Sequence, residues 1–439
     1  MASQDSRGLP LSTTSDSAAA HYRQGVDLML AAWPGAAEAL DAAIHDDPEF
    51  ALAHAARARL HAISAETPQA RAVIASAEGL VAQRGSERER SHVSVLALAI
   101  NGQAAKALKS ALAHIDAWPT DLLIFSLPLG AFGLFAFSGM AGHDQARVDL
   151  CERHANHFGP DDAWFLTNAG WAYAENGAVG RGRDLLERSF ALKGRDANTV
   201  HALAHAMFEA GEGETVKTLI AGWLPTYDRS GILHGHLAWH SALVNLIAGD
   251  AGGALSLYDE HVRPSVSAGL AITVVSDSAS LLWRAQAYGH SLPEGSWAPV
   301  AAFAAKAFPK PGLAFIDVHM ALLEAATGDR AAIERRIAAL ANMTQAGFAG
   351  AGPVTPAICN AALAFADGDY QQCVQILEPV AAEVVRIGGS GAQREIIEDT
   401  LIVAQMRSGE AAKARERLER RLHRRPSPRD TRWLSELPA

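Results

Sequence analysis

The chain has 439 residues, of which 49% are hydrophobic and 20% are charged, and its formal net charge is −10. This hydrophobic content excludes wholesale disorder and supplies a large core, while the acidic balance argues against nucleic-acid binding, which needs a basic surface. Alanine dominates and aromatic residues are few, so the composition favours helix throughout. The three cysteines, Cys151, Cys359 and Cys373, form no C-x-x-C pair and no disulfide framework, and we therefore expect a cytoplasmic protein.

We expect no secretory signal at the N-terminus, because residues 1–18 lack a basic stretch followed by an apolar one. We predict a disordered leader there, a single helical repeat domain over residues 19–425 and a C-terminal tail over residues 426–439. The first repeat is clearest in residues 36–62, where small, large, small and proline residues fall at tetratricopeptide spacing. These positions are Ala36, Leu40, Ala43 and Pro48.

A glycine recurs between two apolar helical stretches along most of the chain. From Gly177 onward the members are separated by between 34 residues (Gly177 to Gly211) and 41 residues (Gly368 to Gly409). The series comprises Gly35, Gly102, Gly142, Gly177, Gly211, Gly249, Gly289, Gly328, Gly368 and Gly409, with one turn near Glu66 and Thr67 that lacks a glycine. A glycine in this position is typical of a left-handed stop between two helices. The pattern therefore predicts an all-α fold, an α-solenoid of about eleven tetratricopeptide-like hairpins, strongly curved or closed around a central pocket.

Residues 122–142 form an uncharged apolar run that is long enough to span a bilayer, for which about 20 residues suffice. The run contains Pro128 and several glycines, and it ends at a turn of the glycine series, where other repeats have their first helix. We therefore predict a buried inner helix, broken at Pro128, and no contact with a membrane.

Four consecutive inner helices carry ionisable residues at similar distances before their turn glycines. His201 and His205 are one helical turn apart, as are His236 and His240, so the two rings of each pair share a face. The next two helices add Asp277, Ser280 and Arg284, and then Asp317 and His319. Neighbouring helices pack about 8–10 Å apart, which allows these side chains to meet in a pocket on the concave face.

Each of these residues alone has a simpler interpretation as part of the core. A lone histidine on an apolar helix is usually a hydrogen-bonded core residue, and His54, His114, His154 and His157 are interpreted in that way or as surface residues. Asp277 and Arg284 could be a buried ion pair between helices. The coincidence of so many polar groups at one depth in adjacent repeats favours a functional pocket.

The order of several motifs resembles the tetratricopeptide repeat protein 38 family, over about residues 160–405. The motifs are H-x-x-x-H at His201–His205, H-x-x-W-H at His236–His240, A-L-x-x-Y-D at Ala254–Asp259, D-S-x-S-L-x-x-R at Asp277–Arg284, D-x-H at Asp317–His319 and G-G-S-x-A-Q-R at Gly388–Arg394. The resemblance implies a closed or strongly curved helical array and little about chemistry. One departure is Gly391, which occupies a position that relatives are expected to fill with a polar residue.

The first functional hypothesis is an enzyme of the hydrolase or lyase type that acts on a small polar molecule. His205 and His240 are the candidate general acid and base, because an imidazole exchanges protons near neutral pH, and Asp277 or Asp317 could orient one of the rings. Arg284 and Arg394 could hold a carboxylate or phosphate by forked hydrogen bonds. The full set of candidate substrate-binding residues is Trp239, Ser280, Arg284, Asp317, His319, Ser390, Gln393 and Arg394.

A metal-dependent variant of this hypothesis uses the histidines as ligands. The candidates are His201, His205, His236 and His240, which are ligand types suited to Zn²⁺, Fe²⁺ or Mn²⁺. Neither histidine pair has the H-E-x-x-H spacing of the zinc proteases, so the signal is weak on its own.

The second functional hypothesis is a non-catalytic scaffold that binds a protein or peptide on its concave face, as tetratricopeptide arrays usually do. The inner helices here are rich in histidine and aspartate and poor in lysine, which favours a compact pocket over a peptide clamp. Fold alone does not decide between these classes, and the sequence also leaves a homodimer open.

Overall fold

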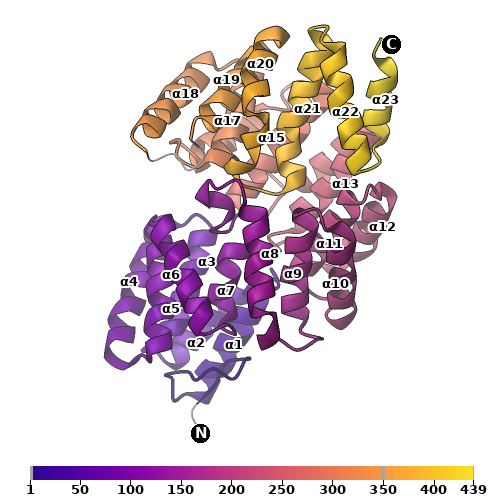
Figure 1. Ribbon diagram of the computed structural model, residues 1–439. Helices are drawn as coiled ribbons and strands as arrows, with labels where there is room; N and C mark the ends of the chain where they lie inside the picture. Colours follow the sequence, from indigo (N-terminus) through magenta and orange to yellow (C-terminus); the bar gives the residue numbers. More distant parts are fainter. Residues whose placement is uncertain (1–2, 348–351, 439) are drawn as a thin grey trace. The chain divides into compact units, whose positions relative to one another are not determined.

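The computed structural model describes residues 3–347 and 352–438, and the regular structure of this part is helical apart from one isolated bridge between Gln4 and Pro10 (Figure 1). Consecutive helices pack against each other as hairpins, for example α1 (Asp16–Leu30) on α2 (Ala36–Asp46) and α3 (Ala51–Ile63) on α4 (Thr67–Arg84). The predicted all-helical repeat array is therefore confirmed. Within the described ranges, no helix is both long enough and apolar enough to cross a membrane.

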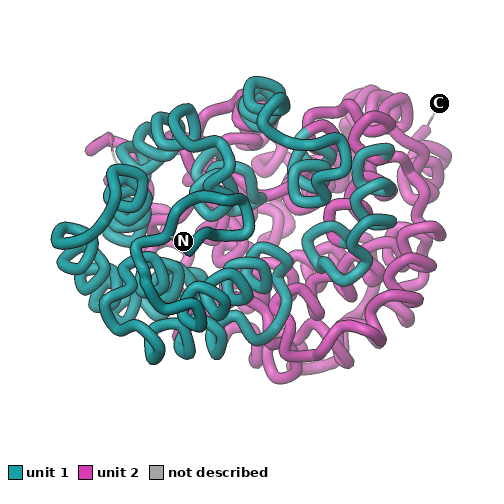
Figure 2. Tube along the Cα trace, turned by 90° about the horizontal axis from the view of Figure 1, so that it is seen from below, with its two compact units in different colours: residues 1–135, 144–172, 184–200 teal, residues 136–143, 173–183, 201–439 magenta. Residues whose placement is uncertain are grey.

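The chain forms two compact units, where the sequence predicted one repeat domain (Figure 2). Unit 1 comprises Met1–Phe135, Asp144–Ala172 and Asp184–Val200, and unit 2 comprises Ala136–His143, Tyr173–Arg183 and His201–Ala439. The other helices of unit 1 are α5 (Glu87–Ile100), α6 (Ala104–Ala117) and α7 (Leu122–Leu129), with the short turn η2 (Ala155–His157). The residues of four helices are divided between the units: α8 (His143–His154), α9 (Ala163–Glu175), α10 (Val179–Leu192) and α11 (Ala197–Glu209).

Unit 2 continues the array to the C-terminal end of the chain. Its helices are α12 (Gly213–Trp223), α13 (His234–Ala248), α14 (Ala251–Leu257), α15 (Ala271–Ala287), α16 (Ala298–Ala307), α17 (Ala314–Ala326), α18 (Arg330–Gln345), α19 (Val354–Ala366), α20 (Tyr370–Leu377), α21 (Gly391–Arg407), α22 (Ala411–Arg424) and α23 (Pro428–Glu436). Shorter helical segments are η1 (Ala136–Ser138), η3 (Leu224–Thr226), η4 (Tyr258–Val262) and η5 (Glu378–Ile387).

Most of the predicted turn glycines have the left-handed backbone that stops a helix. Their φ angles lie between +71° and +93° at Gly102, Gly177, Gly211, Gly249, Gly289, Gly328, Gly368 and Gly409. Gly142 is the exception among the described members of the series, because the residues before it are not helical and there is no helix end to cap. At the turn without a glycine, Ala65 itself adopts φ +61°.

The apolar run at residues 122–142 forms one short helix followed by irregular chain. Helix α7 includes Pro128 and ends at Leu129, and most of its side chains are buried. A side chain at Gly133 would approach the carbonyl oxygen atoms of Leu127 and Pro128 to 2.8 Å, so the chain folds back tightly on the end of α7. The predicted break therefore lies at the end of this helix, and the inner helix is shorter than the apolar run.

Both ends of the described chain are ordered, where the sequence predicted a disordered leader and a tail. The Ser12 N–H donates to Glu89 at 2.9 Å and the Thr13 hydroxyl donates to Asp47 at 2.6 Å, which fixes the segment before α1 in unit 1. Beyond residue 426, Ser427 accepts the N–H of Asp430 and caps α23, and Trp433 of that helix is buried. Local capping and long-range contacts fix both segments. The amino-acid composition of a segment reveals neither kind of interaction.

Unit 2 curls so that its later inner helices return to an earlier one. Helices α13, α15, α17 and α19 pack in succession, and α21 then packs against both α19 and α15. The indole N–H of Trp283 on α15 donates to the Thr400 hydroxyl on α21 at 3.0 Å. Because α13 and α15 are covered on nearly all sides, polar side chains on these helices must find partners inside the protein.

Candidate functional site

Four imidazole rings meet inside unit 2, and we call them the histidine cluster. His201 and His205 extend from α11, and His236 and His240 extend from α13. The Nε2 atom of His201 lies 3.0 Å from Nε2 of His205 and 3.0 Å from Nε2 of His236. One nitrogen from each of the four rings lies within 4.8 Å of the others. The two H-x-x-x-H pairs predicted on adjacent inner helices therefore converge on one point.

Two buried carboxylates hold rings of the cluster from behind. The Nδ1 atom of His236 lies 2.7 Å from Oδ2 of Asp277, and the Nδ1 atom of His205 lies 3.2 Å from Oε1 of Glu175. Both carboxylate side chains are almost fully buried, with 4% and 1% of their surface exposed. Asp277 was predicted as an orienting residue, whereas Glu175 was not predicted at all. Its only sequence signal is its place next to the turn at Gly177, where exposed glutamates are common.

The Asp277 carboxylate determines which ring nitrogen of His236 carries the proton. A carboxylate beside Nδ1 favours the tautomer with the proton on that atom, which leaves the lone pair of Nε2 unprotonated. In His205 and His236 the Nε2 atom is the one that faces His201. A neutral His201 offers either one Nε2–H or one lone pair to these two contacts, so at most one of them is a normal hydrogen bond. Such an arrangement is unfavourable unless a proton or a cation lies between the rings.

His240 completes the cluster without an anchor of its own. Its ring centroid lies 4.4 Å from that of His205 and 4.9 Å from that of His236. Neither ring nitrogen of His240 has a hydrogen-bond partner among the described residues. The neighbouring Trp239 stacks on His236 with an interplanar angle of 8° and acts as a wall of the cluster.

Two rings of the cluster, His201 and His240, favour the uncharged form. Burial, together with the neighbouring histidines, holds the pKa values of His201 and His240 well below their usual range. Burial also raises the pKa of Asp277, although the adjacent His236 lowers it. Neutral imidazoles are the form in which histidine binds metal ions.

Several other predicted site residues have structural partners outside the cluster. Asp317 accepts the N–H groups of Gly312 and Leu313 at 2.8 Å each and pairs with Arg336. Nδ1–H of His319 donates to the carbonyl of Phe315 at 2.8 Å. Asp317 therefore fixes the start of α17 and, through its ion pair with Arg336, joins this helix to α18.

The predicted anion-binding residues are also separated from the histidines. Arg284 pairs with Asp399 at 3.2 Å and donates to the carbonyl of Ala392, so it joins α15 to α21. In place of the Asp277–Arg284 ion pair considered from the sequence, Asp277 contacts His236 and Arg284 pairs with Asp399. The hydroxyl of Ser280 donates to the carbonyl of Asp277 at 3.3 Å.

The Gly-Gly-Ser loop forms a helix cap. Ser390 accepts the N–H of Gln393, and the Gln393 side chain accepts the N–H of Ser390, which is the reciprocal capping box at the start of α21. Arg394 donates to the carbonyl of Gly389 at 2.5 Å. Gly391, the departure from the family pattern, donates its N–H to Oε2 of Glu175 at 2.8 Å. The same carboxylate thus contacts the start of α21 and the histidine cluster.

A cavity of about 400 Å³ lies in unit 2 beside the start of α21, and we call it the α21 cavity. It is lined by Ala174, Glu175, Gly177, Val179, Glu209, Leu377, Ala381, Ala382, Val384, Val385, Gly391, Arg394, Glu395, Ile397, Glu398, Leu401, Arg417 and Arg424. None of the cluster histidines is among these lining residues, and Glu175 is shared by the cavity and the cluster. The sequence predicted one pocket, whereas the structure contains the buried histidine cluster and, beside it, the α21 cavity.

Unit 1 contains a second buried group of histidines, which is a charge network rather than a comparable site. Asp121 accepts from Arg88 at 2.7 Å and lies 2.9 Å from Nδ1 of His92 and 3.2 Å from Nε2 of His114. Burial would raise the pKa of Asp121, but His92, His114 and the Arg88 guanidinium together hold it well below its usual range. His114, predicted as a core or surface histidine, is a buried core residue.

The comparisons with known proteins are remote. The chain matches no family model. It is 12% identical to the tetratricopeptide repeat domain of P58(IPK), with 91% of each chain covered and a TM-score of 0.21. It is 13% identical to a chain in a structure of Naa15/Naa10 bound to HypK-THB, covering 93% of this chain and 63% of that one, with a TM-score of 0.24. Scores of this size add nothing to the fold, which rests on the helices described above, and the resemblance to the tetratricopeptide repeat protein 38 family stays a prediction.

Proposed function

We propose that this helical repeat protein binds a divalent transition-metal ion at His201, His205, His236 and His240. The observation that carries the proposal is the convergence of the four rings, with His236 held by a hydrogen bond to Asp277 and the Glu175 carboxylate 3.2 Å from the His205 ring. Metal-binding histidines commonly donate their second ring N–H to a carboxylate in this way, which fixes the tautomer and raises the basicity of the ligand.

Distances and charge support the same proposal. A tetrahedral ion with bonds of about 2.1 Å holds its ligand atoms about 3.4 Å apart, which lies between the 3.0 Å contacts and the 4.8 Å outer spread of the cluster. The two buried carboxylates would neutralise the charge of a divalent ion. Imidazole ligands suit Zn²⁺ and Fe²⁺ better than Mn²⁺, which prefers oxygen, so Zn²⁺ is the first candidate.

The metal would carry the chemistry that the sequence assigned to a histidine acid and base. With three imidazoles bound and a water in the fourth position, an ion of this kind supplies a hydroxide near neutral pH for hydrolase- or lyase-type reactions of a small polar molecule. His240 is the ligand best suited to yield that position, because neither of its ring nitrogens is anchored among the described residues. His205 would then be a ligand rather than an acid or base.

A second candidate is a structural ion in a non-catalytic scaffold for a protein or peptide partner. Burial favours it, since His205, His236 and His240 are 0%, 5% and 0% exposed, and closed four-ligand sites are typically structural. A thermal-shift screen of small polar metabolites on the metal-loaded protein separates the two candidates. Stabilisation by a metabolite that is lost in His236→Ala supports the enzyme, and binding only to a peptide or protein supports the scaffold.

Elemental analysis of protein purified without a histidine tag or chelator tests the metal centre. We expect about one equivalent of Zn²⁺ or Fe²⁺ per chain in the wild type and below a tenth in His205→Gln/His236→Gln. The matched control is His45→Gln/His423→Gln, which changes two exposed histidines and should keep the wild-type metal content. Less than about a tenth of an equivalent in the wild type, with no binding of added Zn²⁺, overturns the proposal.

A further inference from the structure

One wall of the α21 cavity is aliphatic. It consists of residues from α20, η5 and α21, namely Leu377, Ala381, Ala382, Val384, Val385, Ile397 and Leu401. Ala381, Val384 and Val385 are only half-buried in the protein alone. Covering such methyl groups with an apolar ligand removes their surface from water, which is favourable by about 25 cal/mol per Å². The wall therefore favours a ligand with a hydrocarbon part.

The lining of the cavity also includes two arginines, Arg417 and Arg424, whose nearest acids are already neutralised by other residues. Arg417 lies 3.8 Å from Glu378, but Lys413 lies closer to that carboxylate, at 2.7 Å. A separation of 3.8 Å is too long for a hydrogen bond, so the Arg417 guanidinium retains capacity for an anion.

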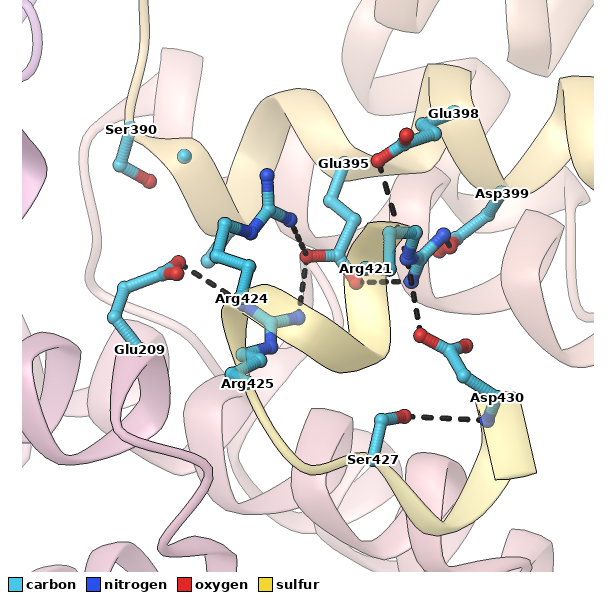
Figure 3. Close-up of polar contacts among 12 residues, drawn as sticks. Glu209, Ser390, Glu395, Glu398, Asp399, Arg421, Arg424, Arg425, Ser427 and Asp430 are labelled. Carbon is cyan, nitrogen blue, oxygen red and sulfur yellow. Dashed lines mark hydrogen bonds and ion pairs between the residues drawn. The ribbon is translucent and has the colours of Figure 1, made fainter. Parts of the chain in front are cut away.

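The nearest acid of Arg424 is also neutralised by other residues. Arg424 lies on α22 seven residues after Arg417, two helical turns away on the same face. It lies 3.8 Å from Glu395, which already contacts Arg421 at 2.6 Å and Arg425 (Figure 3). Arg429 lies 3.1 Å from the same carboxylate. Slightly more than half of the Arg424 side chain is exposed. The two guanidiniums thus present surplus positive charge at the same cavity.

The carboxylates at the cavity are mostly compensated. Glu209 pairs with Arg425 at 3.1 Å, and Oε2 of Glu175 accepts the Gly391 N–H at 2.8 Å. Glu398 lies 3.9 Å from Arg421, and burial raises its pKa above the usual range, which reduces its charge and its repulsion of an anion. An incoming anion therefore meets two arginines with little opposing charge.

We propose that the α21 cavity binds a small aliphatic carboxylate, with the chain on the wall formed by α20 and η5 and the carboxylate between Arg417 and Arg424. A cavity of about 400 Å³ is at the small end of ligand sites, which fits a chain of about six to ten carbons. The proposal does not depend on the metal centre, because no cluster histidine lines the cavity.

Octanoate is the probe, with octan-1-ol and octylamine as controls that keep the chain and change the head group. Calorimetry on the full chain should show saturable binding of octanoate, and binding at least about tenfold weaker for both controls, since charge-assisted hydrogen bonds to the carboxylate are lost. Equal affinity for octan-1-ol, tighter binding of octylamine or no binding of octanoate overturns the proposal.

Two variants locate the site. Arg417→Gln/Arg424→Gln should weaken octanoate binding at least about tenfold, whereas Arg420→Gln on the same helix should not change it, because that side chain is 65% exposed and pairs with Glu416. Ala381→Phe fills the aliphatic wall and should abolish binding while it leaves both arginines in place. Thermal unfolding confirms that each variant is folded, and metal content, measured in parallel, should stay at the wild-type value. Wild-type affinity in the double variant, or binding only of peptides with a free C-terminal carboxylate, contradicts this site.

Discussion

The Nδ1 atom of His236 lies 2.7 Å from Oδ2 of Asp277, and the two side chains are 5% and 4% exposed. An imidazole and a carboxylate in contact inside a protein are costly to bury unless each satisfies the other. Here the contact also orients the ring, because the proton held on Nδ1 leaves the Nε2 lone pair directed at His201. The buried contact between Asp277 and His236 therefore sets the direction in which a candidate metal ligand points.

Removing the charge of Asp277 should weaken metal binding without unfolding the protein. Asp277→Asn preserves shape and an acceptor oxygen, and we expect metal affinity to fall about 10- to 100-fold, as for other partners behind a ligand. Competition with a chromophoric chelator measures the change. The control is Asp41→Asn, since that carboxylate is 57% exposed and pairs with Arg57 in unit 1. Unchanged affinity in Asp277→Asn would mean that the carboxylate does not support a ligand.

The four histidines should contribute unequally to the metal centre. His240→Ala removes the ring with no anchor among the described residues, and a site with three imidazoles and a water remains a stable arrangement for zinc. We expect His240→Ala to retain about half or more of the wild-type metal content, and His236→Ala to fall below about a tenth. Elemental analysis of both variants side by side checks this order, and the reverse order would contradict the assignment of His236 as an anchored ligand.

The repeat architecture was predictable because its signals are local. A glycine that ends a helix with positive φ acts within its own turn, and eight members of the predicted series do so. The departures from the predictions have two origins, one local and one long-range. Gly142 has no helix before it to cap, and the ordered segments at residues 3–15 and 427–438 depend on contacts with distant residues such as Glu89.

The site was predictable only where helical periodicity alone decides the geometry. Spacing by one turn brought His201, His205, His236 and His240 together as expected. Glu175 was missed because its role depends on how α9 packs beside α11, which no spacing encodes. Asp317 does not join the cluster, because two N–H groups at the start of its own helix already donate hydrogen bonds to its carboxylate.

The pH dependence of stability should include a contribution from His319. Burial lowers the pKa of this ring to about 4, whereas an exposed histidine in the unfolded chain titrates near 6.5. Between these values the unfolded state binds a proton that the native state does not, so stability is present above about pH 6.5 and is lost as the pH falls toward 4. Between pH 7 and pH 5 the loss is on the order of 2 kcal/mol.

His319→Gln isolates that contribution, because glutamine can still donate to the Phe315 carbonyl but does not titrate. Urea unfolding of wild type and variant at pH 7 and pH 5 gives the comparison. The difference between the two pH values should be smaller in the variant by about the same 2 kcal/mol. Parallel pH profiles for the two proteins would show that His319 titrates normally and that its burial has no effect on acid stability.

Arg421 should be the most sensitive position of the C-terminal helices. Its guanidinium contacts Glu395 at 2.6 Å, Asp399 at 2.8 Å and Asp430 at 3.0 Å, with 3% of the side chain exposed (Figure 3). Replacing a whole buried ion network by apolar residues can be neutral, but removing one partner leaves unpaired charge and typically costs about 3–5 kcal/mol. We expect Arg421→Met to lose that much unfolding free energy.

The matched control is Arg420→Met, one residue earlier on α22, where the side chain is 65% exposed and pairs with Glu416 at 3.4 Å. An exposed ion pair of this kind contributes about 0–1 kcal/mol, so its loss should be barely measurable in urea unfolding. Both variants remove one positive charge from the same helix. A difference between their unfolding free energies therefore measures the effect of burial and not that of charge. Equal stability of the two variants would mean that Arg425 and Arg429 neutralise the three carboxylates without Arg421, and that the C-terminal helices are held by apolar contacts such as that of Trp433.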